Sequence, residues 1–113
     1  MNIEAVIINY LKTALETDHV YAEVPVPAPA EFFVIDKTGS STTNRICTST
    51  VAIQSYGPSK FRASELNEAI KQAMDGIVTL DSIGACHIVS DYNFSNIAKK
   101  QHRYQAVFDI THY

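Results

Sequence analysis

Apolar residues recur every three or four positions in two separate stretches of the chain, and this spacing predicts two amphipathic helices. The first is expected over residues 3–16, with Asn2 as its N-terminal cap. The second is expected over residues 59–75, where Ser59 is available as the cap and Gly76 as the C-terminal stop. Each helix would turn one apolar stripe toward a core.

Five other stretches have the short apolar or alternating pattern that is typical of strands. They are residues 20–24, 32–36, 46–56, 85–94 and 102–113. The resulting order is α-β-β-β-α-β-β, in which strands arrive in runs rather than alternating with helices. This order favours an α+β fold with a mostly antiparallel five-stranded sheet and both helices packed on one face.

The last of these strands predicts one buried and one exposed face, because side chains alternate along a strand. The side chains expected on the core face are Tyr104, Ala106, Phe108 and Ile110. The opposite face would carry Arg103, Gln105, Val107, Asp109 and Thr111. Since that second face is only mildly polar, we expect it to contact another subunit or a partner protein.

Three connecting stretches interrupt this pattern. Residues 25–29 carry alternate prolines, which predict a stiff extended connection outside the sheet; a proline-rich ligand for a partner domain is the alternative. Residues 37–45 are rich in Gly, Ser, Thr and Asn, and they predict either a polar loop or the tip of a long hairpin. Residues 95–101 would join the last two strands.

Length and charge narrow the class of protein. A chain of 113 residues predicts a single domain that can bury its own core. The formal net charge of −3 argues against a general nucleic-acid binder, although Lys99, Lys100 and Arg103 form a local basic group. The start of the chain lacks the pattern of a secretory leader and no stretch is apolar enough to span a bilayer, so we expect intracellular folding without a membrane partner.

Residue types that bind metals are present without the spacing of a metal site. We expect Cys47 and Cys86 to behave as small buried hydrophobic residues. The histidines are His19, His87, His102 and His112. Because these residues share no ligand spacing, we expect no metal and no cofactor.

Two carboxylates are the only candidates for acid–base chemistry. Asp91 and Asp109 lie in neighbouring predicted strands, where they could face each other. The favoured interpretation is a solvated or salt-bridged face, with Lys99, Lys100 and Arg103 as partners. No nucleophile motif accompanies the pair, so no catalytic residue is expected.

Aromatic residues are numerous, with six tyrosines and five phenylalanines. Those near the last strands and the second helix are Tyr56, Tyr92, Phe94, Tyr104 and Tyr113. A stacking platform for bases or sugars is one interpretation. A protein–protein interface is favoured, because clustered basic residues are lacking and tyrosine is enriched at such interfaces.

Several segments carry a resemblance to a known family. They are residues 20–25 (VYAEVP), Tyr56, residues 65–68 (ELNE), 73–74 (AM), 90–94 (SDYNF) and 101–110 (QHRYQAVFDI). Together with the opening helix they cover nearly the whole chain, and it resembles the tail terminator, or tail completion, proteins of long-tailed bacteriophages and prophages. None of these motifs is a catalytic signature.

The resemblance implies a structural protein of the virion tail or neck, assembled in the bacterial cytoplasm. It implies an α+β domain that forms a ring, usually hexameric, which caps the tail tube, ends its growth and helps join tail to head. The implied partners are other copies of the chain, the tail-tube protein and the head–tail connector protein. The acidic charge would let DNA pass through the ring without specific binding.

The residues expected to contact these partners lie in the polar stretch after the second strand and around the last two strands. They are Lys37, Thr38, Ser40, Asn44, Arg45, Tyr92, Phe94, Lys99, Lys100, Arg103, Gln105 and Tyr113. Two alternatives stay open. One is a different head–tail connector component, and the other is a small ligand-binding module or enzyme that uses Asp91, Asp109 and the aromatic face.

Overall fold

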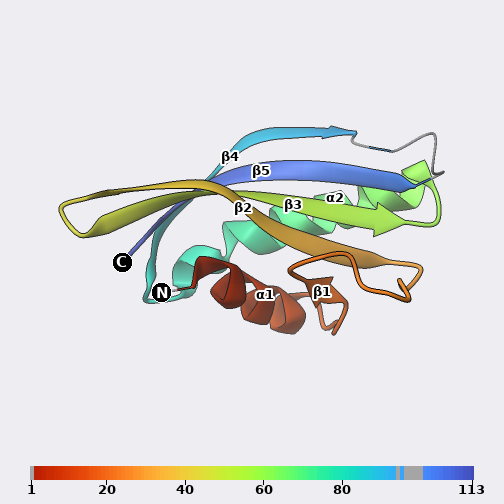
Figure 1. Ribbon diagram of the computed structural model, residues 1–113, viewed down its shortest axis with the longest axis horizontal. Coiled ribbons are helices and arrows are strands. Elements are labelled where there is room, and N and C mark those ends of the chain that lie inside the picture. Colours follow the sequence, from red (N-terminus) through yellow and green to blue (C-terminus); the bar gives the residue numbers. More distant parts are fainter. Residues whose placement is uncertain (1, 94, 96–100) are drawn as a thin grey trace.

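The computed structural model describes residues 2–93, 95 and 101–113. Its elements are α1 (Ile3–Ala14), β1 (Val20–Tyr21), β2 (Phe32–Thr43), β3 (Ile46–Gly57), α2 (Lys60–Asp75), the 3₁₀ helix η1 (Ile77–Thr79), β4 (Ile83–Asn93) and β5 (His102–His112). The strands form a five-stranded sheet in the order β1-β2-β3-β5-β4, and both α-helices cover the same face (Figure 1). The predicted α+β class and element order are confirmed.

Both helices begin at their predicted caps. The side chain of Asn2 accepts a hydrogen bond from the backbone N–H of Ala5 at 3.1 Å. The side chain of Ser59 accepts one from the backbone N–H of Arg62 at 3.2 Å. Helix α1 ends at Ala14, before the predicted residue 16, because Glu16 adopts a left-handed φ of 53° that a helix cannot continue.

The glycine after α2 is required by a close contact between the two helices. A Cβ on Gly76 would lie 2.8 Å from the hydroxyl oxygen of Tyr10, and that hydroxyl donates a 2.7 Å hydrogen bond to the carbonyl of Ala73. The φ of Gly76 is −89°, so the predicted stop is correct but left-handed geometry is not its cause. Burial raises the pKa of Tyr10.

The strand predicted over residues 20–24 is shorter than expected. Only Val20 and Tyr21 pair with a neighbour, and they run parallel to β2, whereas the other strand pairs are antiparallel. The chain leaves the sheet before residues 25–29, whose prolines cannot donate ladder hydrogen bonds. The prediction that the proline stretch lies outside the sheet is therefore confirmed.

The polar stretch of residues 37–45 is a hairpin tip and not a loop. Strand β2 continues to Thr43, which pairs with Ile46 of β3. Asn44 and Arg45 form the turn, with φ values of 51° and 67°. Positive φ at both positions is typical of a two-residue hairpin turn, whose twist matches that of the flanking strands.

The core lies between the helices and one face of the sheet. Its buried side chains are Ile3, Ile7, Leu11, Val20, Phe33, Ile35, Val51, Ile53, Leu66, Ile70, Met74, Ile77, Ile83, Ala106, Phe108 and Ile110. The predicted core face of the last strand is confirmed at Ala106, Phe108 and Ile110, which are buried, while Tyr104 is half-buried.

The two cysteines are free and half-buried. Cys86 packs against this core, and burial raises its pKa to about 11.

A polar pair is enclosed at one end of this core. Ser49 and His112 are 2% and 5% exposed, and the Ser49 hydroxyl lies 2.8 Å from Nε2 of His112. Burial lowers the pKa of His112, and the positive charge of Lys37 adds to the effect. The neutral imidazole is therefore the form that the fold accommodates.

We predict that acid destabilises the fold through this histidine. An imidazole of the unfolded chain takes up a proton near a pH of about 6.5, while the folded one resists protonation until the pH is lower. The stability contributed by neutral His112 is thus present above that pH and is lost as the pH falls toward the folded pKa. Thermal melting across this range should show a steeper loss for the wild type than for His112→Gln. Equal pH slopes for the two proteins would contradict the assignment.

Candidate assembly surfaces

The β2–β3 hairpin projects beyond the helices as an arm (Figure 1). We define the hairpin arm as residues 36–46, every one of which is exposed. Five predicted contact residues lie together on it: Lys37, Thr38, Ser40, Asn44 and Arg45. At the base of the arm, the backbone N–H of Lys37 donates a 3.4 Å hydrogen bond to the carboxylate of Glu4 in α1.

The tip of the arm keeps an arginine in a conformation that favours glycine. Arg45 has a φ of 67° at the second turn position, where Gly is the preferred residue of such hairpins. Between them, residues 37–45 contain Lys37 and Arg45 and no acidic residue. The arm, which also carries Asp36 at its base, therefore has a net positive charge and an exposed arginine at its tip, on a protein of negative net charge.

The sheet face away from the helices carries a row of joined polar side chains, which we call the polar ladder. Gln54 donates to Gln105 at 3.0 Å and accepts from the Tyr56 hydroxyl at 2.8 Å, while Gln105 also donates to the hydroxyl of Tyr92. Arg103 donates to that same Tyr56 hydroxyl at 3.0 Å and lies over its ring, 5.7 Å from the centroid. These bonds fix the ladder side chains in defined positions on the face that the helices do not cover, where Tyr56 is itself buried.

Beside the ladder, on the same sheet face, Tyr56 also belongs to a small second apolar cluster with Phe32 and Val34, against which Tyr21 packs. The rings of Phe32 and Tyr56 are stacked with centroids 4.3 Å apart. Sequence reasoning missed this cluster and Gln54. The signal was the spacing of two between Gln54 and Tyr56, which places both on one strand face.

The predicted contact residues fall into two groups at opposite ends of the sheet. Arg103 pairs with Tyr56 at one end of β3, whereas the Asn44–Arg45 tip of the arm follows Thr43 and precedes Ile46 at the other end, roughly 30 Å of strand away. Lys37, at the base of the arm, lies between them, opposite Val51. Tyr113 belongs to the arm end, where its hydroxyl would lie 3.0 Å from a Cβ added to Gly84. Phe94, Lys99 and Lys100 lie outside the described residues.

The predicted pairing of two carboxylates is wrong. Asp91 lies opposite Ala106 on the helix-facing side, where Asn67 and Lys71 of α2 donate to it at 2.7 and 2.6 Å. Asp109 lies on the other face and accepts a 2.8 Å hydrogen bond from the Thr50 hydroxyl. The bond to Asp91 is the largest cause that raises the pKa of Lys71. Both carboxylates are thus held by local partners, on opposite sides of the sheet.

The aromatic residues do not form a single stacking platform. Tyr56 and Tyr92 share the polar ladder, but Tyr104 lies between Arg103 and Gln105 in β5 and therefore points to the opposite face. Tyr113 lies near Gly84, away from the ladder.

The edge strand β4 is a third surface that could contact another chain. It has a neighbour only on its β5 side among the described strands. A register shift between Ile88 and Ser90 marks a bulge, and Ile88 and Val89 are 50% and 58% exposed there. Adjacent exposed apolar side chains on an open edge favour pairing with another chain.

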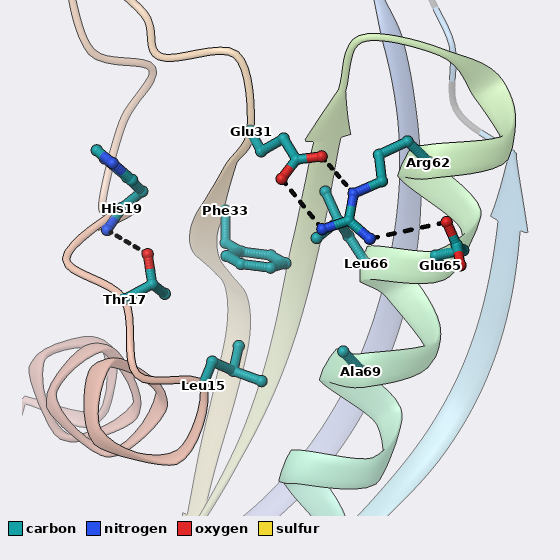
Figure 2. Close-up of a pocket in the computed structure, with 9 residues that line it drawn as sticks. All are labelled: Leu15, Thr17, His19, Glu31, Phe33, Arg62, Glu65, Leu66 and Ala69. Carbon is teal, nitrogen blue, oxygen red and sulfur yellow. Dashed lines mark hydrogen bonds and ion pairs between the residues drawn. The ribbon is translucent and has the colours of Figure 1, made fainter.

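A cleft of about 310 Å³ lies between the end of α1 and the first half of α2 (Figure 2). Phe33 and Leu66 line it, and an ion pair between Glu31 and Arg62 spans one side. The hydrogen bond from Arg62 lowers the pKa of Glu31, so this carboxylate is ionised and already paired. His19 lies across the cleft from the ion pair (Figure 2). The arrangement supplies no activated nucleophile beside a free base.

Within residues 2–93, 95 and 101–113, no three side chains of His, Cys, Asp and Glu gather as the ligands of a metal ion would. No helix in the described part of the chain has the length and hydropathy needed to cross a bilayer.

Comparison of the sequence with protein-family models and with curated proteins gives no match. Membership of the tail terminator family therefore stays a prediction that rests on the resemblance alone.

Proposed function

We propose that this chain is a structural protein of a phage or prophage tail, which caps the tail tube as a ring, ends its growth and helps join the tail to the head. One observation carries the proposal most directly. The hairpin arm and the polar ladder occupy different parts of the sheet and differ in chemistry: the arm is exposed and has Arg45 at its tip, whereas the ladder is a largely half-buried set of bonded amide, phenol and guanidinium groups. A ring needs two such different patches on each subunit, because its contacts are heterologous.

The proposed mechanism is steric. A ring seated on the last layer of the tube would cover the surface on which another layer grows. The formal charge of −3 on each copy would disfavour DNA binding in the lumen. The proposal requires no bond to be made or broken, and it assigns the virion tail or neck as the site of action and the tail-tube and connector proteins as partners.

A different head–tail connector component is the second candidate, and the same surfaces favour it equally. Position in the particle separates the two functions. A ligand-binding module or enzyme built on Asp91 and Asp109 loses its support, because these carboxylates lie on opposite faces of the sheet.

Electron microscopy of particles made without this protein tests the proposal. We expect overlong tails that are not joined to heads, since nothing would stop tube growth or complete the neck. Tails of normal length that fail to join heads would favour the connector role instead. Tails of normal length joined to heads would contradict both.

A further inference from the structure

Two long stretches of sheet edge have no strand partner among the described residues. One is β4, the last strand in the sheet order. The other is β2 beyond its short pairing with β1, which reaches only Phe33 and Val34. Because Glu4 already accepts the N–H of Lys37, the open part of β2 is residues 38–43, about 20 Å of strand. Open edges offer backbone donors and acceptors to another chain.

The edge of β4 is interrupted by the bulge near Ile88, but it carries neither of the residue types that most often guard an edge. Its sequence, IGACHIVSDYN, contains no proline and no lysine, the residues that most often guard edges. Instead it exposes Ile88 and Val89 side by side. Apolar side chains on an edge become buried when a strand is added there.

We propose that residues 38–43 of the hairpin arm add as a strand to the β4 edge of a second copy of this chain. Each copy would give its arm to one neighbour and its β4 edge to the other, so both open edges are covered and the contact propagates around a ring. This inference deepens the proposed function, on which the ring rests. It names the β4 edge, on the strand that carries the ladder residue Tyr92, as the patch that receives the arm.

Charge favours this arrangement over the pairing of one arm with another. The arm carries Lys37 and Arg45 against one carboxylate, Asp36, and so is net positive, while exposed Asp75 ends α2 and exposed Asp81 lies in the connection that leads into β4. Pairing arm with arm would bring the positive groups of the two copies together. Pairing the arm with β4 places opposite charges side by side, which also explains why an arginine is kept at a turn position that favours glycine.

Substitution on the edge tests the proposal with the full chain. In sedimentation velocity over a range of concentrations, wild type should self-associate, and Ile88→Lys/Val89→Lys should weaken association by about tenfold or more. Both positions are exposed, so the variant should melt as the wild type does. Val26→Lys is the matched control, because Val26 is 96% exposed and lies in the proline stretch away from both edges. A wild type that stays monomeric at its highest soluble concentration, or an edge variant that associates like the control, would overturn the proposal.

Crosslinking gives a second test that does not depend on the lysine variant. In a Cys47→Ser/Cys86→Ser background, chains with Ser40→Cys are mixed with chains with Val89→Cys and treated with a short bismaleimide. We expect mixed dimers to exceed dimers of either chain with itself. Dimers only between like chains, or no dimers, would overturn the proposal. Tail length reports on the proposed function and these assays report on strand pairing, so each can fail without the other.

Discussion

Replacing Ile53 by alanine should lower the free energy of unfolding by about 2–5 kcal/mol, a large share of the roughly 5–15 kcal/mol expected for a domain of this kind. Ile53 is 0% exposed in β3, between Ile35 of β2 and Ala106 of β5. The rigid sheet and the helices above it cannot collapse into the cavity, so the lost contacts are not recovered. Urea unfolding followed by circular dichroism measures the effect.

The matched control is Ile46→Ala in the same strand. Ile46 is 43% exposed on the hairpin arm, so its truncation should cost less than about 1 kcal/mol. Equal losses at the two positions would show that β3 is not the centre of the core.

Shortening the hairpin arm should abolish self-association while leaving the domain folded. The design removes residues 41–43 of β2 and 46–48 of β3, which pair with one another. The Asn44–Arg45 turn then connects Ser40 directly to Ser49, which are themselves a strand pair. It preserves the contact between Ser49 and His112. Sedimentation beside thermal melting should report a cooperative monomer whose association is at least about tenfold weaker.

Arg45→Gly is the companion variant, because it keeps the length of the arm. Glycine relieves the left-handed φ at the turn, so the melting temperature should hold or rise. Association should weaken only partly, since the strand edge remains and one positive charge is lost. If the variant with the shortened arm associates like the wild type, the arm does not contribute to self-association.

The helices and the core face of β5 could be predicted because each packs on the core from one side. Ala106, Phe108 and Ile110 alternate with polar residues since only one face of β5 meets the helices. The arm offered no such signal, because neither of its faces meets a core. Its threonines suit a strand, but its Gly, Ser and Asn are equally typical of a loop.

The placement of Asp91 could not be predicted, because β4 contains irregularities that alternation does not reveal. Register shifts between Ile83 and Ala85 and between Ile88 and Ser90 each move the following side chains to the other face. Simple alternation therefore fails along this strand. The polar ladder was partly predictable, since Arg103 and Gln105 share a face, while its partners on β3 depend on strand order, which pattern alone does not give.

The most direct test of the central claim, that the protein acts by shape and self-association, is to add the purified chain to growing tail tubes that lack it. Electron microscopy would follow tube length and the density at the tube end. The account predicts that growth stops and that a ring appears at the end of each tube, with wild type but not with the shortened arm. Tubes that keep growing beneath bound wild-type chain, or that stop equally well with the shortened arm, would contradict it.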